Sequence, residues 1–568
     1  MPYKLHLDAF HQLLADDWDA QMQADPLFAT DTGDHRFDDR LPRVDEAAMA
    51  QRLQELRAFV QRLKVIDRAA LPSAERLNYD IFDRLLSNEI GMLEFHAYRM
   101  PLSKAGGFHI SFPELYRMMP METLADHQSY IARLRAFRQY VDDHLEVMRA
   151  GLDEGQIPAR ATLLGLEETI RPHLVDDPIQ SQLYTPFRQF PAGIAAQDAA
   201  ALSAAGAAAI RESVVPGYAA LLAFLEKEYL PAARQTIAAS DLPDGRSYYQ
   251  HCIRYHTALD LSPEAIHQTG LEEVQRIRTE MQEVIRQVNF DGDFQAFVEF
   301  LRTDPRFYVT TPEALLEKTA LILKRMDGEL PRLFKTLPRM PYGIRPIPDY
   351  AAPGNTTAYY QPGAGDGTRA GSYYVNTYDL KSRPLYEMEA LSLHEAVPGH
   401  HLQIALQQEL DLPPFRRFRW FNSYIEGWAL YAERLGIGNG FYTDPYSNFG
   451  RLSYEMWRAC RLVVDPGIHA LGWTRQQAID FMAEHTSLTL RNITNEVDRY
   501  IAWPGQAVAY KLGEIKIRQL RSRAEQALAA EFDLRQFHDV ILTSGAVPLD
   551  VLEEMVETWI CGGVKRVP

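Results

Sequence analysis

The densest group of potential metal ligands in this chain is the run 394–401, His-Glu-Ala-Val-Pro-Gly-His-His. It lies within the apolar-rich stretch 391–406, where ionised groups are costly to bury unless a cation or hydrogen bonds compensate them. In the H-E-x-x-H motif, two histidines one helical turn apart bind zinc, and the glutamate between them activates a water. Pro398 stands where the second histidine of that motif would be, so a regular helix cannot form the site.

The proline and the glycine that follows it offer a way to restore the geometry. On an ideal helix His401 lies about 10.5 Å further along the axis than His394, which is too far for two imidazoles to share one ion. Pro398 leaves the carbonyl of His394 without its usual partner, and Gly399 tolerates unusual backbone angles. We therefore expect a local bulge. If it absorbs two residues, His400 is the second ligand, and if it absorbs fewer, His401 is.

Two adjacent histidines near a helix kink could also simply hydrogen-bond to backbone carbonyls. The His-Glu pair in front of them and the Pro-Gly pair between favour metal binding, and we predict Zn²⁺. Glu395 would then be the general base that takes a proton from the metal-activated water and passes it to the leaving amine.

A catalytic zinc ion needs a third protein ligand and an open fourth position. Glu426 is the best candidate, because it lies on the next predicted helix, residues 421–435, among apolar neighbours. Two alternatives stay open: Glu433 is the ligand, or Glu426 pairs with an arginine such as Arg458.

These residues resemble a large bacterial family known as domain of unknown function 885, which carries an HExxPGHH motif. That family is similar to the helical zinc peptidases typified by angiotensin-converting enzyme and carboxypeptidase Taq. The resemblance spans nearly the whole chain, at residues 33–37, 393–402, 426–433, 461–469 and 499–506. It implies a mainly α, zincin-like metallopeptidase fold of two lobes around a cleft, with a small β-sheet beside the metal helix. It also supports a glutamate ligand from the helix after the motif, and hydrolysis of peptide bonds in short peptides.

Further site residues follow from the same resemblance. Donors for the oxyanion of the reaction are drawn from His469, Tyr500 and Tyr510. Arg499 and Lys511 could bind a substrate carboxylate. The alternative for Asp465 is that its carboxylate holds an imidazole in one tautomer. The chain has 28 tyrosines, so any one of them is more often a packing residue than a catalytic one.

The segment 338–379 is rich in proline, glycine and tyrosine, and it predicts short strands at 342–348, 358–361 and 372–377. Zincin-type peptidases have a small sheet before the metal helix, whose edge strand pairs with the substrate backbone. We expect residues 372–377 to be that strand, with Tyr374 and Asn376 binding substrate. The alternative is a β-flap that only covers the core.

Composition narrows the class of protein. The net charge of −17, from 59 basic and 76 acidic residues, argues against a nucleic-acid or membrane partner. The three cysteines are far apart and odd in number, which disfavours a disulfide framework and fits a reducing compartment. No apolar signal-peptide core is visible at the N-terminus, and the alanine-rich segment 195–228 is expected to be too short and too interrupted to span a membrane. We predict a cytoplasmic protein.

Taken together, the sequence predicts one helical catalytic unit over residues 1–568, with one lobe at about 1–270 and a metal-binding lobe at about 271–568. The predicted reaction is zinc-dependent hydrolysis of a short peptide. Hydrolysis of a non-peptide amide and metal retention by a binding protein without turnover are the alternatives. The sequence makes no prediction about the oligomeric state.

Overall fold

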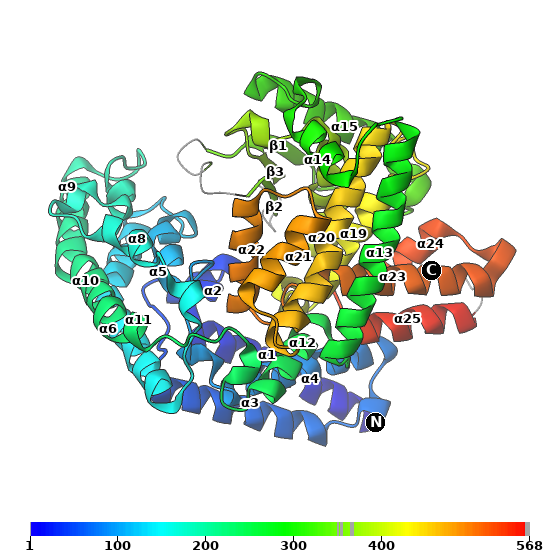
Figure 1. Cartoon of the computed structure of the whole chain (residues 1–568). Coiled ribbons are helices and arrows are strands. Elements are labelled where there is room, and N and C mark those ends of the chain that lie inside the picture. Colours follow the sequence, from blue (N-terminus) through cyan, green and yellow to red (C-terminus); the bar gives the residue numbers. More distant parts are fainter. Residues whose placement is uncertain (1, 349–351, 353–355, 364–368, 563–568) are drawn as a thin grey trace. The chain divides into compact units, whose positions relative to one another are not determined.

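The computed structural model describes residues 2–348, 352, 356–363 and 369–562. It is mainly α-helical with one small sheet, which confirms the predicted fold class at that level (Figure 1). The chain divides into two compact units, residues 1–251 and 252–568. The sequence placed this division near residue 270.

The first unit consists of helices joined by loops and short 3-10 turns. Its helices are α1 Pro2–Ala24, α2 Pro26–Thr32, α3 Glu46–Val65, α4 Ser73–Glu94, α5 Phe108–Ser111, α6 Leu124–Glu154, α7 Arg160–Leu163, α8 Glu167–Ile170, α9 Ala196–Ala209, α10 Val215–Phe224 and α11 Leu230–Ala232, and α12 Gly245–Thr257 crosses into the second unit. The long helix α6 begins at a capping box, in which Thr123 and Asp126 each bond the other's backbone N–H, and it ends at Gly155 in the left-handed region.

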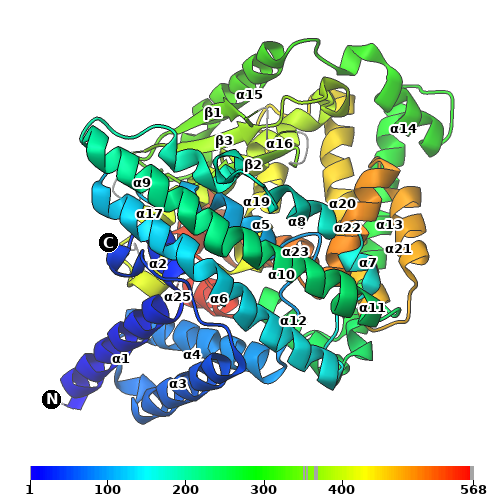
Figure 2. The same cartoon turned by 90° about the vertical axis from the view of Figure 1, so that its left-hand side faces the viewer.

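The alanine-rich segment forms one continuous helical stretch, Ala196–Ala232, in which two π-helical turns separate α9, α10 and α11. At 37 residues it is long and apolar enough to cross a membrane, so the prediction that it is too short was wrong. Of its most apolar window, 56% is buried within the protein. It lies beside α6 (Figure 2), where the ring of Tyr218 contacts that of Phe137 at 4.8 Å, as in the core of a globular domain.

In the second unit, helices that are far apart in the sequence pack against each other. Its helices are α13 Pro263–Gln287, α14 Phe294–Thr303, α15 Pro312–Leu333, α16 Met388–Glu395, α17 His400–Glu409, α18 Pro414–Phe418, α19 Asn422–Leu435, α20 Pro445–His469, α21 Arg475–His485, α22 Leu490–Ala502, α23 Ala509–Leu528, α24 Leu534–Leu542 and α25 Leu549–Gly562. Helix α13 packs along α20, and α19 packs along α23. The latter pair approaches closely at Gly427, where an added Cβ would lie 2.5 Å from the Cα of Gly513. This contact fixes α19, the helix that carries Glu426.

The sheet of the second unit has three strands: β1 Tyr342–Pro346, β2 Ala358–Gln361 and β3 Gly371–Val375. Their order is β1-β3-β2, with β3 parallel to β1 and antiparallel to β2. The prediction that residues 372–377 form an edge strand was therefore wrong, because β3 is central and both of its edges are paired. Within the described residues, β2 is paired on one side only.

Candidate metal centre

The motif lies on two helices rather than on one bulged helix. Helix α16 ends at Glu395, residues 396–399 leave the helical conformation, and α17 begins at His400. The backbone groups of this break are bonded: the N–H of His401 donates to the carbonyl of Ala396 at 3.0 Å, and the indole of Trp428 donates to the carbonyl of Pro398 at 2.9 Å. The interruption is thus larger than the predicted bulge, and α19 helps to hold it through Trp428.

The break brings His400 back to His394, and Glu426 of α19 faces both. The Oε2 atom of Glu426 lies 3.6 Å from Nε2 of His394 and 3.7 Å from Nε2 of His400, and one ligand atom from each residue lies within 4.8 Å of the others. Two ligand atoms about 2.1 Å from a tetrahedral zinc ion are roughly 3.4 Å apart. Among the described residues, the Oε2 atom of Glu426, which lies between these nitrogens, is buried and has no hydrogen-bond partner. The donor set therefore fits a divalent cation.

Charge in the cluster also fits a cation. Burial raises the pKa of Glu426, but contact with His394 and the charges of His400 and Arg458 outweigh it and lower the pKa to about 2. Burial lowers the pKa of His400 to about 4, so its imidazole is neutral at pH 7. Burial also opposes charge on His394, yet contacts with Glu426 and Glu433 raise its pKa to about 9. The carboxylates of Glu426 and Glu433 thus stabilise a positive charge at this position. A metal ion could supply that charge in place of the proton on His394.

Glu433 lies behind His394. Its Oε1 atom is 2.8 Å from Nδ1 of His394, and Glu433 as a whole is 3% exposed. The guanidinium of Arg458 lies 3.6 Å from the same oxygen. Glu433 thus lies on the side of the His394 ring away from Glu426, and the ion pair of Arg458 is with Glu433, so this arrangement favours Glu426 as the candidate ligand. Carboxylates in this position fix the orientation and tautomer of metal-binding histidines.

Glu395 lies at the end of α16, beside the backbone N–H of Tyr360 in β2. Burial raises the pKa of Glu395, as does the charge of Glu426, while His394, Arg458 and the hydrogen bond from Tyr360 lower it. The resulting pKa of about 7 suits a group that both accepts and releases a proton near neutral pH.

His401 does not join the cluster, and its prediction as a metal ligand is corrected. Its Nδ1 atom lies 2.9 Å from the hydroxyl of Tyr360, and its ring lies 4.6 Å from that of Tyr342. Because α17 restarts at residue 400, the next side chain points to the other side of the helix, toward the sheet.

Tyr510, on α23, is the predicted tyrosine that the structure brings near the cluster. Burial raises the pKa of its hydroxyl, and the charge of Glu426 raises it further. Its ring also lies 4.5 Å from the guanidinium of Arg461.

Tyr500 and His469 are engaged elsewhere. The hydroxyl of Tyr500 donates to Glu496 at 2.7 Å and accepts from Arg461 at 3.0 Å. The Nε2 atom of His469 lies 2.9 Å from the backbone carbonyl of Tyr500, and both residues are fully buried. Asp465 accepts from the N–H of Gly505 at 3.1 Å. The predicted oxyanion roles of Tyr500 and His469 are corrected to packing roles.

The two predicted carboxylate-binding cations are also paired internally. Arg499 bonds Glu496 at 2.9 Å and Gln506 at 2.7 Å. Lys511 is fully buried, with its ammonium 2.8 to 3.0 Å from the carboxylates of Glu455, Glu514 and Glu273. That acidic trio therefore surrounds a lysine, and Lys511 is not available to a substrate.

The residues predicted on the strand 372–377 face inward or pack on the sheet. Asn376 is fully buried and donates from its amide to the carbonyls of Ala352 and Thr356, each at 2.9 Å. Tyr374 stacks on Tyr359 across β2 and β3 at 4.9 Å. Asn376 thus has a structural role, and β1 and β2 are the outer strands of the sheet among the described residues.

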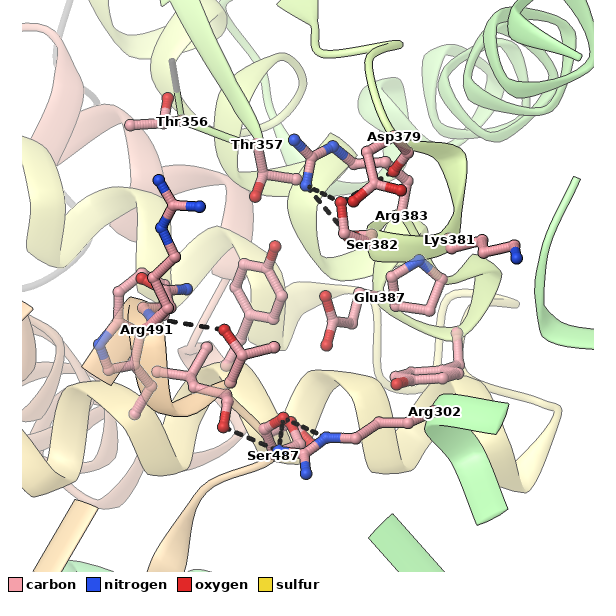
Figure 3. Close-up of a pocket in the computed structure, with 18 of the residues that line it drawn as sticks. Arg302, Thr356, Thr357, Asp379, Lys381, Ser382, Arg383, Glu387, Ser487 and Arg491 are labelled. Carbon is pink, nitrogen blue, oxygen red and sulfur yellow. Dashed lines mark hydrogen bonds between the residues drawn. The ribbon is translucent and has the colours of Figure 1, made fainter. Parts of the chain in front are cut away.

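The structure also reveals a polar cavity of 570 Å³ in the second unit that our sequence interpretation missed (Figure 3). Its lining includes Arg302, Arg383, Glu387 and Arg491. The available signal was the charged stretch just before the motif helix, from Asp379 to Glu387.

Comparison with known proteins gives a family and a fold. No curated protein matches the chain. A crystal structure of a "putative lipoprotein" from Colwellia psychrerythraea is similar over 98% of this chain and 99% of its own, with 29% identity and a TM-score of 0.91. A "putative lipoprotein of unknown function" from Shewanella oneidensis shares the fold over 96% and 99%, with 19% identity and a TM-score of 0.75. The family described as bacterial protein of unknown function, DUF885, matches residues 26–556, and the chain belongs to that family.

Proposed function

We propose that this protein is a zinc-dependent hydrolase that cleaves peptide bonds in short peptides. The observation that carries the proposal is the convergence of His394, His400 and Glu426 beside the carboxylate of Glu395. Three nitrogen and oxygen ligands with a fourth position left for water are typical of catalytic zinc sites, whereas structural sites use four protein ligands.

The residues of the chain divide the work of hydrolysis. His394, His400 and Glu426 would hold the ion, which would supply Lewis acidity to a water molecule and to the scissile carbonyl. Glu395 accepts the proton of the attacking water and returns it to the leaving amine, for which a pKa near 7 is suited. Tyr510 donates its hydroxyl hydrogen to the oxygen on which negative charge develops.

The proposal also includes four features that were inferred from the sequence. They are the zincin-like arrangement, the similarity to helical zinc peptidases, peptides rather than nucleic acid or membrane as partners, and a cytoplasmic location. An exported location is the competing one, because both structural neighbours are called "putative lipoprotein".

The test compares the wild type with Glu395→Gln and with Glu554→Gln, a control that changes an exposed glutamate of α25. We expect one zinc ion per chain in all three proteins. We also expect chelator-sensitive cleavage of short peptides that Glu395→Gln lowers by roughly 10²- to 10⁴-fold and the control leaves unchanged.

Other results would indicate a different function for this protein. Cleavage of blocked amides but not of peptides indicates a non-peptide amidase. Zinc binding with no turnover in any form indicates a binding protein. A wild type that binds no divalent metal contradicts the proposal.

A further inference from the structure

The 570 Å³ cavity of the second unit is lined by three arginines from three separate segments. Arg302 comes from α14, Arg383 from the loop before α16, and Arg491 from the first turn of α22. Figure 3 shows them around the carboxylate of Glu387, while Lys381 extends away from the centre. The cavity therefore gathers positive charge that the fold has brought together from distant parts of the sequence.

Backbone carbonyls, rather than carboxylates, hold two of these arginines. Arg302 donates to the carbonyls of Ser487 at 3.0 Å and Leu488 at 2.7 Å, and Arg383 donates to the carbonyl of Asn376 at 3.1 Å. Carbonyl oxygens fix a guanidinium without cancelling its charge.

The positive charge of the cavity is therefore only partly neutralised by the residues that line it. Among the described residues, Arg491 has no hydrogen-bond or ion-pair partner, and neither Arg302 nor Arg383 forms an ion pair within 4.0 Å. The lining has two acidic residues, Asp379 and Glu387, against the three arginines and Lys381. The balance favours an anion as ligand.

The distance from this cavity to Glu395 can be estimated along two segments of backbone, one leading into β2 and the other along α16. Strand β2 has Tyr360 beside Glu395, and Thr357, three residues earlier, lines the cavity, which corresponds to about 10 Å of extended chain. From Glu387, the N-cap of α16, to Glu395 at its end, the eight helical steps rise about 12 Å. The two estimates agree on a separation of about three extended residues.

We propose that this cavity binds a carboxylate of the substrate, about three residues along the peptide from the bond that is cleaved. The inference rests on the proposed function, because it assigns the substrate class of the same centre. An extended peptide alongside β2, the strand whose Tyr360 lies beside Glu395, would run from Glu395 toward the arginines. Asn492 and Asn495 of α22 add amide groups to the cavity wall.

The test measures binding separately from turnover. Zinc-loaded Glu395→Gln protein is titrated by calorimetry with tetra-alanine and with tetra-alanine amide. We expect the free acid to bind on the order of tenfold more tightly than the amide. Adding Arg491→Gln should remove that preference, whereas Arg535→Gln, a matched change of an exposed arginine on α24, should retain it.

A second substitution gives the opposite sign. Glu387→Gln removes the carboxylate at the centre of the cavity, so it should tighten binding of the free acid. If the cavity instead bound the amino end of a peptide, Glu387→Gln would weaken binding and N-acetylation would abolish it. That result overturns the inference.

Amidated peptides with a single aspartate at successive positions separate the two sources of carboxylate. Tight binding restored at one position identifies an acidic side chain, and binding that requires the free C-terminus identifies the chain end. Both outcomes support the inference. Equal affinity for acid and amide, or no binding of any peptide, overturns it.

Failure of this inference is distinguishable from failure of the proposed function. If the wild type cleaves peptides regardless of their carboxylate, the function stands and the carboxylate site does not. If binding depends on the carboxylate and on Arg491 but no peptide is cleaved, the carboxylate site stands and the proposed function does not.

Discussion

The Nδ1 atom of His394 lies 2.8 Å from Oε1 of Glu433, and this contact turns the opposite nitrogen of the ring toward Glu426. Glu426 and Glu433 lie on the same face of α19, two turns apart. Helix α19 thus supplies both a candidate metal ligand, Glu426, and the carboxylate that orients the ring of His394, Glu433.

The first prediction concerns this orienting carboxylate. Glu433→Gln should lower zinc affinity by roughly 10- to 100-fold, because the amide is a weaker acceptor for the imidazole N–H than the carboxylate. The measurement is competition with a chromogenic chelator at pH 7.5, with Glu554→Gln as control. Unchanged zinc affinity in a folded Glu433→Gln protein would show that Glu433 serves only packing.

The second prediction uses the two adjacent histidines as a matched pair. His400→Gln should lower zinc affinity at least about 100-fold, because it removes a proposed ligand. His401→Gln should retain zinc and lower the free energy of unfolding by about 1 kcal/mol or more, because it loses the contact with the Tyr360 hydroxyl and the ring packing against Tyr342. Metal content by mass spectrometry and urea unfolding check the two parts. Zinc lost from His401→Gln but kept by His400→Gln would reverse the assignment.

The sequence was sufficient for those features that local spacing decides. Strong helical periodicity and the proline-rich segment predicted a mainly α chain with a small sheet. His394 and Glu395 also followed from local order. The choice between His400 and His401 did not, because it depends on how many residues leave the helix. The bond from the Trp428 indole to Pro398, made by a side chain thirty positions away, helps to set that number.

Other site residues depended on long-range pairing that spacing cannot reveal. Residues Glu426 and Glu433 lie on one stripe, so only the packing of α16 against α19 shows which nitrogen of His394 each of them faces. Lys511 looked available to a substrate until three glutamates, one of them from α13, were found around it. The prediction of the edge strand failed for a similar reason. The order of strands along the chain does not reveal that β3 lies between β1 and β2 in the sheet.

The third prediction concerns acid stability of the first unit. His144 is buried and stacks on Phe108 at 4.0 Å, and neither of its ring nitrogens has a hydrogen-bond partner among the described residues. Burial lowers the pKa of His144 to about 3, below its ordinary value of 6.5. The unfolded chain therefore binds a proton that the folded chain excludes, so stability is lost as the pH falls from about 6.5 toward 3.

His144→Phe should remove this dependence while retaining the stack. Between pH 7 and pH 5 we expect the wild type to lose up to about 2 kcal/mol more stability than the variant, since each pH unit below 6.5 costs about 1.4 kcal/mol. Urea unfolding at both pH values measures the difference, and His11→Gln, a change of an exposed histidine in the same unit, is the control. Parallel losses in wild type and variant would show that His144 does not govern acid stability.

The last prediction concerns the backbone of the break between α16 and α17. A Cβ added at Gly399 would lie 1.9 Å from the carbonyl oxygen of His394 and 2.4 Å from that of Leu393. Both obstacles are backbone atoms, so they cannot turn aside as a side chain could. Gly399→Ala should therefore cost at least about 3 kcal/mol of stability and weaken zinc binding.

Gly328→Ala is the matched control, because Gly328 is an exposed position within α15 with no heavy atom within 4 Å of an added Cβ. It should raise stability by about 0.5 to 1 kcal/mol, since alanine is the better helix former. The same methyl group is thus expected to act with opposite sign at the two glycines, and urea unfolding with zinc titration measures both effects. A stable, zinc-binding Gly399→Ala protein would mean that the chain between His394 and His400 follows another path, and the geometry that brings these two rings to one ion would lose its basis.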